Sequence, residues 1–170
     1  MKLWHLPLLA LLLAGCGQGD KPATAGATLD RTRYVAASEP AGAKGVIEVR
    51  KDAKDGAEVV VVGRIGGHGK TPFTGRAAFT IVDPSLKTCD EIGEECPTPW
   101  DYCCDTKETM AKSTMMIRFV DEQGKTIAAD AKSGLGVKEM DAVVVKGKIV
   151  KSPDGELSVV ASQLFVRPKK

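Results

Sequence analysis

The chain has 170 residues, which is enough for one hydrophobic core and short for two. Its 24 lysines and arginines nearly balance its 22 aspartates and glutamates, for a net charge of +2. Proteins that bind polyanions usually carry a larger basic excess, so the charge argues against nucleic acid as a partner.

The chain opens with a short leucine-rich run that ends at Leu13-Ala14-Gly15-Cys16. A membrane-spanning helix needs about 20 apolar residues, so the run indicates a processed leader and not a span. The motif resembles the lipobox of bacterial lipoproteins, in which a peptidase cuts before the cysteine and the thiol carries a diacylglyceryl group. The resemblance implies a signal peptide over residues 1–15 and a lipid on Cys16 that holds the protein at a membrane. The alternative is an ordinary secretory signal that contains a cysteine.

A lipid on Cys16 constrains the rest of the chain. Four cysteines remain, and an even number in an oxidising compartment indicates disulfides. His5 leaves with the leader, so His68 is the only imidazole left, and a site with several histidine ligands is excluded. Gly17 after the cysteine resembles the outer-membrane sorting signal of enteric bacteria. The predicted location is therefore the cell envelope, facing the periplasm, with the outer membrane favoured over the inner.

Residues 16–38 are rich in glycine, alanine and threonine without an apolar period, which predicts a flexible tether. Ser38-Glu39-Pro40 then favours the start of a helix, because serine caps helices and proline suits the first turn. Three apolar residues follow at helical spacing before Gly56: Val46, Val49 and Ala53. Their β-branched neighbours fit a strand equally well.

Five Val- and Ile-rich runs downstream predict strands. They cover residues 58–65, 77–82, 114–120, 143–150 and 157–166. The last two are joined by Ser152-Pro153-Asp154-Gly155, a hairpin turn in which proline restricts φ and glycine accepts a positive one.

Residues 60–65 of the first strand, the fourth strand (143–150) and the last strand (157–166) carry a resemblance to the OB-fold. This five-stranded barrel often binds oligonucleotides or sugars. The resemblance implies a mainly-β, OB-like barrel domain over residues 39–170. It departs from the family at the insertion of residues 84–113 between strands two and three. The helix that usually follows strand three has a candidate only at 128–132, and a β-sandwich is the alternative fold.

The insertion contains four cysteines: Cys89, Cys96, Cys103 and Cys104. A disulfide from Cys89 to either of the last two would close about 15 residues and stabilise the fold by about 3 kcal/mol. Neighbouring cysteines rarely pair because the ring is strained. Cys103 and Cys104 are therefore expected to pair separately with Cys89 and Cys96, in an order that stays open.

Two other uses of these cysteines are considered. A soft metal site for copper or zinc could recruit Met110, Met115 and Met116, although the spacing differs from C-x₂-C zinc knuckles. Strand alternation instead places Met115 in the core and Met116 on the opposite face. A redox-active disulfide would lack the usual C-x-x-C spacing. Structural disulfides are the favoured interpretation, and no cofactor or metal is assigned.

A glycine-rich loop after the first strand is the candidate ligand site. Its basic residues are Arg64, His68, Lys70 and Arg76. Five residues separate Gly63 from Gly69-Lys70-Thr71, one more than a phosphate-binding P-loop allows. The loop therefore predicts at most an anion site in the place where OB-folds commonly bind ligands.

Trp100 and Tyr102 offer a stacking surface, or else pack over the disulfides. Residues 84–109 carry seven carboxylates and two lysines, which would repel nucleic acid. No catalytic arrangement is identified. The sequence thus predicts a membrane-anchored, non-enzymatic binding module for an envelope protein, a glycan or another anionic ligand. A metal-handling or thiol–disulfide redox protein is the alternative.

Overall fold

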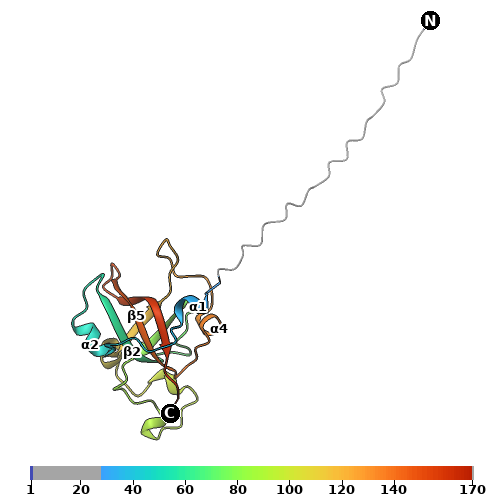
Figure 1. The fold of residues 1–170 in the computed structure, drawn as a ribbon. Helices are drawn as coiled ribbons and strands as arrows, with labels where there is room; N and C mark the ends of the chain where they lie inside the picture. The colour runs from blue at the N-terminus through green and yellow to red at the C-terminus, as the bar shows by residue number, and fades with distance from the viewer. Residues whose placement is uncertain (2–27, 170) are drawn as a thin grey trace.

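A computed structural model describes residue 1 and residues 28–169, and a β-barrel forms the centre of the domain (Figure 1). The predicted signal peptide, Cys16 and the predicted tether up to residue 27 lie outside the described residues. Within residues 28–169, no helix has both the length and the apolar character needed to cross a membrane.

Five strands make the barrel. They are β2 (Glu58–Ile65), β3 (Ala78–Val82), β4 (Thr114–Arg118), β5 (Ala142–Lys151) and β6 (Leu157–Val166). The strand order is β2-β3-β4-β6-β5, and β5 pairs back onto β2, which closes the sheet. All pairs are antiparallel except β4–β6. This order is the OB-fold topology, so the predicted fold is confirmed. The sandwich alternative is wrong because one sheet closes on itself.

The barrel interior follows strand alternation. Phe79 and Ile81 on β3 and Met115 and Ile117 on β4 are all at most 1% exposed, whereas Met116 is 39% exposed on the outer face. The placement of the two methionines is therefore as predicted. On β5, Gly147 lies at a register shift, where a β-carbon would overlap the carbonyl oxygen of Val160 on β6. Glycine permits this close approach of the two backbones.

The domain begins earlier than predicted. Two residues of this segment are buried in the core: Leu29, which precedes the short helix α1 (Arg31–Tyr34), and Tyr34, which is the last residue of that helix. The Tyr34 ring meets Phe119 edge-on, with centroids 4.9 Å apart, and the Ala36 N–H donates to the Leu164 carbonyl. The end of the predicted tether is therefore wrong for residues 29–36. Leu29 and Tyr34 are isolated apolar residues that form no periodic pattern in the sequence, so their burial was not predicted.

The predicted N-terminal helix exists as α2 (Val46–Lys51) but does not start at residue 38. The two-residue strand β1 (Lys44–Gly45) comes first and pairs in parallel with β2. The Asp83 carboxylate then accepts a 2.9 Å hydrogen bond from the Ile47 N–H and so caps the helix from a distant segment. Because this cap comes from a distant part of the chain, the local serine–proline signal misplaced the start.

The insertion contains three short helices, none of which was predicted. They are η1 (Asp90–Ile92), η2 (Pro99–Asp101) and α3 (Lys107–Ser113). The helix after β4 is α4 (Ala131–Leu135), which begins three residues later than its candidate because Asp130 caps it. In Figure 1 the yellow-green part of the insertion projects from one end of the barrel.

Candidate functional site

Tyr102 fastens the insertion to the barrel. Its side chain is 1% exposed and packs in a small second core with Val82 and Met110. Its backbone adopts the left-handed region (φ 50°), which is uncommon outside glycine. The ring lies over Gly66, where a β-carbon would come within 2.9 Å of it. The glycine-rich loop thus makes room for the insertion.

The same loop is held by two residues next to Tyr102. The Gly67 N–H donates to the Trp100 carbonyl at 2.8 Å, and the Gly69 N–H donates to Asp101 Oδ1 at 2.7 Å. The indole N–H of Trp100 donates to the Lys70 carbonyl at 3.3 Å. Trp100 therefore packs against the loop, and His68 Nδ1 lies 3.9 Å from the Asp101 carboxylate.

Arg64 also has a local partner. Its guanidinium makes a two-pronged ion pair with Glu91, at 3.0 and 3.2 Å, and donates a longer hydrogen bond to the Tyr102 hydroxyl. Burial lowers the pKa of Arg64, but Tyr102 and Glu91 together raise it above its ordinary value. The four basic residues predicted to form one anion site are thus not brought together. Arg64, His68 and Lys70 belong to the contact with the insertion, and Arg76 lies apart.

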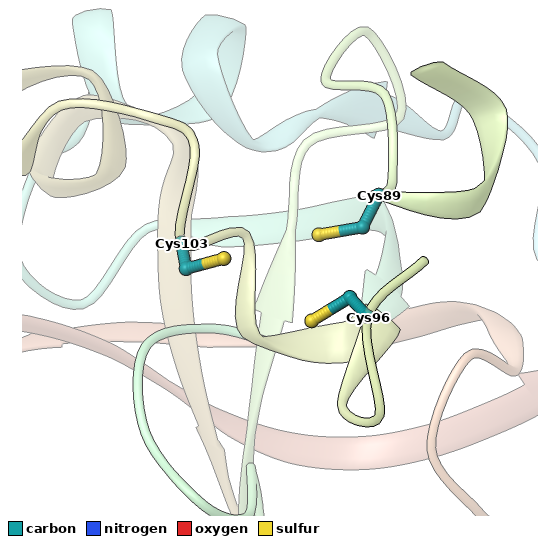
Figure 2. A group of neighbouring side chains, drawn as sticks. All are labelled: Cys89, Cys96 and Cys103. Atoms are coloured by element: carbon teal, nitrogen blue, oxygen red, sulfur yellow. The ribbon is translucent and has the colours of Figure 1, made fainter. Parts of the chain in front are cut away.

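Three thiols of the insertion converge on one point. Cys89, Cys96 and Cys103 each place their sulfur within 4.8 Å of the other two, and we call them the thiol cluster. Figure 2 shows the three sulfurs pointing toward one another from three separate stretches of backbone. Cys104 lies outside this group, although its thiol neighbours that of Cys103.

The predicted disulfide pairing is not the arrangement found. The four cysteines that the structure describes are free thiols. Cys103 approaches both Cys89 and Cys96, whereas Cys104 approaches neither closely enough to join them. Cys103 and Cys104 are the central residues of a turn closed by the Asp105 N–H on the Tyr102 carbonyl, so both cannot face the same point.

The thiols of the cluster differ in their surroundings. Cys89 is 1% exposed, and burial, followed by the neighbouring thiols, raises its pKa to about 12. Hydrogen bonds from the backbone and hydroxyl of Thr98 lower the pKa of Cys96. Cys103 is open to solvent. An incoming ion or oxidant would therefore meet Cys103 and Cys96 before Cys89.

A second candidate site lies on the outer face of the barrel, which we call the β3–β4 groove. Its cavity measures about 370 Å³. It is lined by Thr74, Arg76, Ala78, Met116, Arg118, Lys125 and Thr126. An adjoining hollow of about 230 Å³ shares Met116. The insertion covers Val82 further along β3 but leaves Met116 exposed.

The β3–β4 groove is basic. Arg76 and Arg118 both bind Thr126, through its carbonyl (2.7 Å) and its hydroxyl (3.1 Å). Within residues 28–169, no carboxylate lies within ion-pair distance of Arg76, Arg118 or Lys125. Sequence reasoning selected Arg76 but missed the other two cations. Alternation along β4 could have indicated Arg118, since it shares the outer face with Met116.

No family model matches the chain, and no curated protein matches it. Solved structures that resemble it include the hypothetical protein YgiW from E. coli, at 15% identity over 76% of this chain and 96% of the other (TM-score 0.41). The OBody AM1L10 bound to hen egg-white lysozyme is 16% identical over 79% and 100% (TM-score 0.44). The mitochondrial single-stranded DNA binding protein Rim1 from S. cerevisiae is 13% identical over 69% and 100% (TM-score 0.32). These TM-scores are low, so strand order and register carry the fold assignment.

Proposed function

We propose that this protein is a lipid-anchored, non-enzymatic binding module of the bacterial cell envelope that holds an anionic glycan in the β3–β4 groove. The observation that carries the proposal is a group of three cations that have no carboxylate partner among residues 28–169. Arg76, Arg118 and Lys125 come from different segments and line one cavity on the face that OB-folds use for ligands. Guanidinium groups pair well with the carboxylates and sulfates of acidic sugars.

A glycan suits the groove better than nucleic acid does. No aromatic side chain is among the residues that line it, so bases would find no stacking surface. Two threonines, Thr74 and Thr126, supply hydroxyls of the kind that hydrogen-bond sugars.

The groove is tested by replacing Arg118 with glutamine. Loss of one charge-assisted hydrogen bond is expected to weaken binding of a fluorescent heparin oligosaccharide about tenfold, measured by anisotropy at fixed salt. Lys148→Gln is the matched control, because it removes one exposed charge from β5, which borders neither β3 nor β4. Neutral dextran and a single-stranded oligonucleotide are the comparison probes. Equal losses for both variants, or tighter binding of the oligonucleotide, would contradict the assignment.

The anchor is tested separately, since it depends on Leu13-Ala14-Gly15-Cys16 and not on the groove. Cells that express the full chain should incorporate labelled palmitate into the protein, and Cys16→Ser should abolish that label. Cys104→Ser serves as the control, because it removes an exposed cysteine outside the motif. Palmitate label that survives Cys16→Ser would exclude the lipoprotein assignment. Recovery of the parent protein in the soluble fraction, away from membranes, would also exclude it.

A further inference from the structure

We propose that the thiol cluster is a binding site for one soft metal ion, held by the thiolates of Cys89, Cys96 and Cys103, with copper(I) as the ion that it suits. The inference is independent of the proposed glycan function, because no residue of the cluster lines the β3–β4 groove.

The spacing of the sulfurs supports a metal site. Metal–sulfur bonds of about 2.3 Å place two sulfurs on one trigonal ion about 4 Å apart. The three sulfurs here lie within 4.8 Å of one another, so small rotations would close them around an ion. A disulfide needs two sulfurs at about 2 Å and would leave the third thiol unused. Because all three sulfurs approach one point, the arrangement favours three ligands over one bonded pair.

The backbone holds the three cysteines in place before any ion arrives. The Cys89 carbonyl accepts hydrogen bonds from the Ile92 and Glu94 N–H groups, which closes the turn around η1. Tyr102, buried and left-handed, directs the chain so that Cys103 faces the other two. A non-glycine residue kept in that region is typical of sites where position matters more than local backbone energy.

The chemistry of the ligand set selects the ion. Thiolates are soft ligands that prefer copper(I) and zinc over hard cations. Zinc is almost always four-coordinate in structural sites, whereas three thiolates satisfy copper(I) without a fourth ligand. Binding would release the thiol protons, and a coordinated thiol is deprotonated even where burial otherwise keeps it neutral, as at Cys89. The carboxylates of the insertion add a negative field that attracts cations.

The test is an anaerobic copper(I) titration of the reduced full-length protein against a chromogenic chelator. One equivalent is expected to bind, with a thiolate-to-copper charge-transfer band and three sulfur neighbours in X-ray absorption. Cys96→Ser and Cys103→Ser should each weaken binding on the order of 100-fold, because each removes one of three ligands. Cys104→Ser should bind as the parent does, and it is the matched control because it alters the residue adjacent to Cys103.

Tryptophan fluorescence of each metal-free variant, compared with that of the metal-free parent, shows whether Trp100 and the insertion still dock, so a loss of copper binding is not mistaken for unfolding. Three results would overturn the proposal. The first is that the reduced protein binds no copper. The second is that Cys104→Ser loses as much affinity as Cys103→Ser. The third is an intact mass, after purification without reductant, that shows two disulfides among the four cysteines.

Discussion

Replacing Tyr102 with alanine is expected to lower the free energy of unfolding by about 3–5 kcal/mol, the range for removing a buried aromatic side chain. The ring fills the second core between Val82 and Met110, and it covers Gly66. Its removal would leave a cavity bordered by Val82, Met110 and Leu86, the other members of this small cluster. The substitution should therefore release the insertion before it unfolds the barrel.

Chemical denaturation followed by two signals distinguishes these events. The chain has two tryptophans, and in protein without the leader Trp100 is the only one, so its fluorescence reports on the insertion. Far-ultraviolet circular dichroism reports on the barrel. In Tyr102→Ala the fluorescence transition should precede the dichroism transition. Tyr102→Phe is the control, with a cost below about 1 kcal/mol, because the hydroxyl accepts only a 3.4 Å hydrogen bond from Arg64. Coincident transitions in Tyr102→Ala would show that insertion and barrel unfold as one unit.

Asp83→Asn is expected to lower the free energy of unfolding by about 2 kcal/mol at neutral pH. The carboxylate is 5% exposed and accepts hydrogen bonds from the Ile47 N–H and from both the N–H and the hydroxyl of Ser85. The asparagine amide keeps one acceptor oxygen, but its NH₂ group replaces the second oxygen. That NH₂ group would then face either the Ile47 N–H or the Ser85 donors, with which it makes no hydrogen bond. Ser85→Ala is the control that removes one hydroxyl and leaves the helix cap in place.

The effect of Asp83→Asn should depend on pH. Burial raises the pKa of Asp83, but the hydrogen bonds from Ile47 and Ser85 outweigh it and hold the pKa below its ordinary value. A carboxyl with a lower pKa in the folded state stabilises the protein above its unfolded pKa of about 3.9, and that contribution is lost as the pH falls through the folded value. The stability gap between parent and variant should thus be constant above about pH 5 and narrow in stronger acid. A gap of constant size down to acid unfolding would mean that the carboxylate charge contributes nothing.

The strands were predictable because their signals are local. Runs of β-branched residues that end at turns, as at Ser152-Pro153-Asp154-Gly155, determine where each strand begins and ends within two residues. Alternation likewise assigned Met115 to the core and Met116 to the surface. Helix α2 shows the limit of such signals, since its cap is Asp83, 36 positions after the residue that it caps.

The candidate sites were less predictable because charge and reactivity depend on neighbours. The sequence suggested that Arg64 is a free cation, but in the folded chain its guanidinium lies 3.0 Å from the Glu91 carboxylate. No sequence pattern marks Arg118 and Lys125 as binding residues. They become candidates only because the fold places them beside Arg76 in one cavity. The spacing of the cysteines suggested two pairs, whereas folding brings three of them together.

The sequence by itself therefore determined a mainly-β domain of OB type, a Cys-rich insertion and a motif that predicts a lipid anchor. Tertiary structure decided the rest: burial of Leu29 and Tyr34, docking of the insertion on the glycine-rich loop, and the positions of the β3–β4 groove and the thiol cluster. Periodicity and turn residues act over a few neighbouring positions, so the sequence displays them directly. Contacts between distant segments depend on strand register and barrel closure, which only the assembled fold defines.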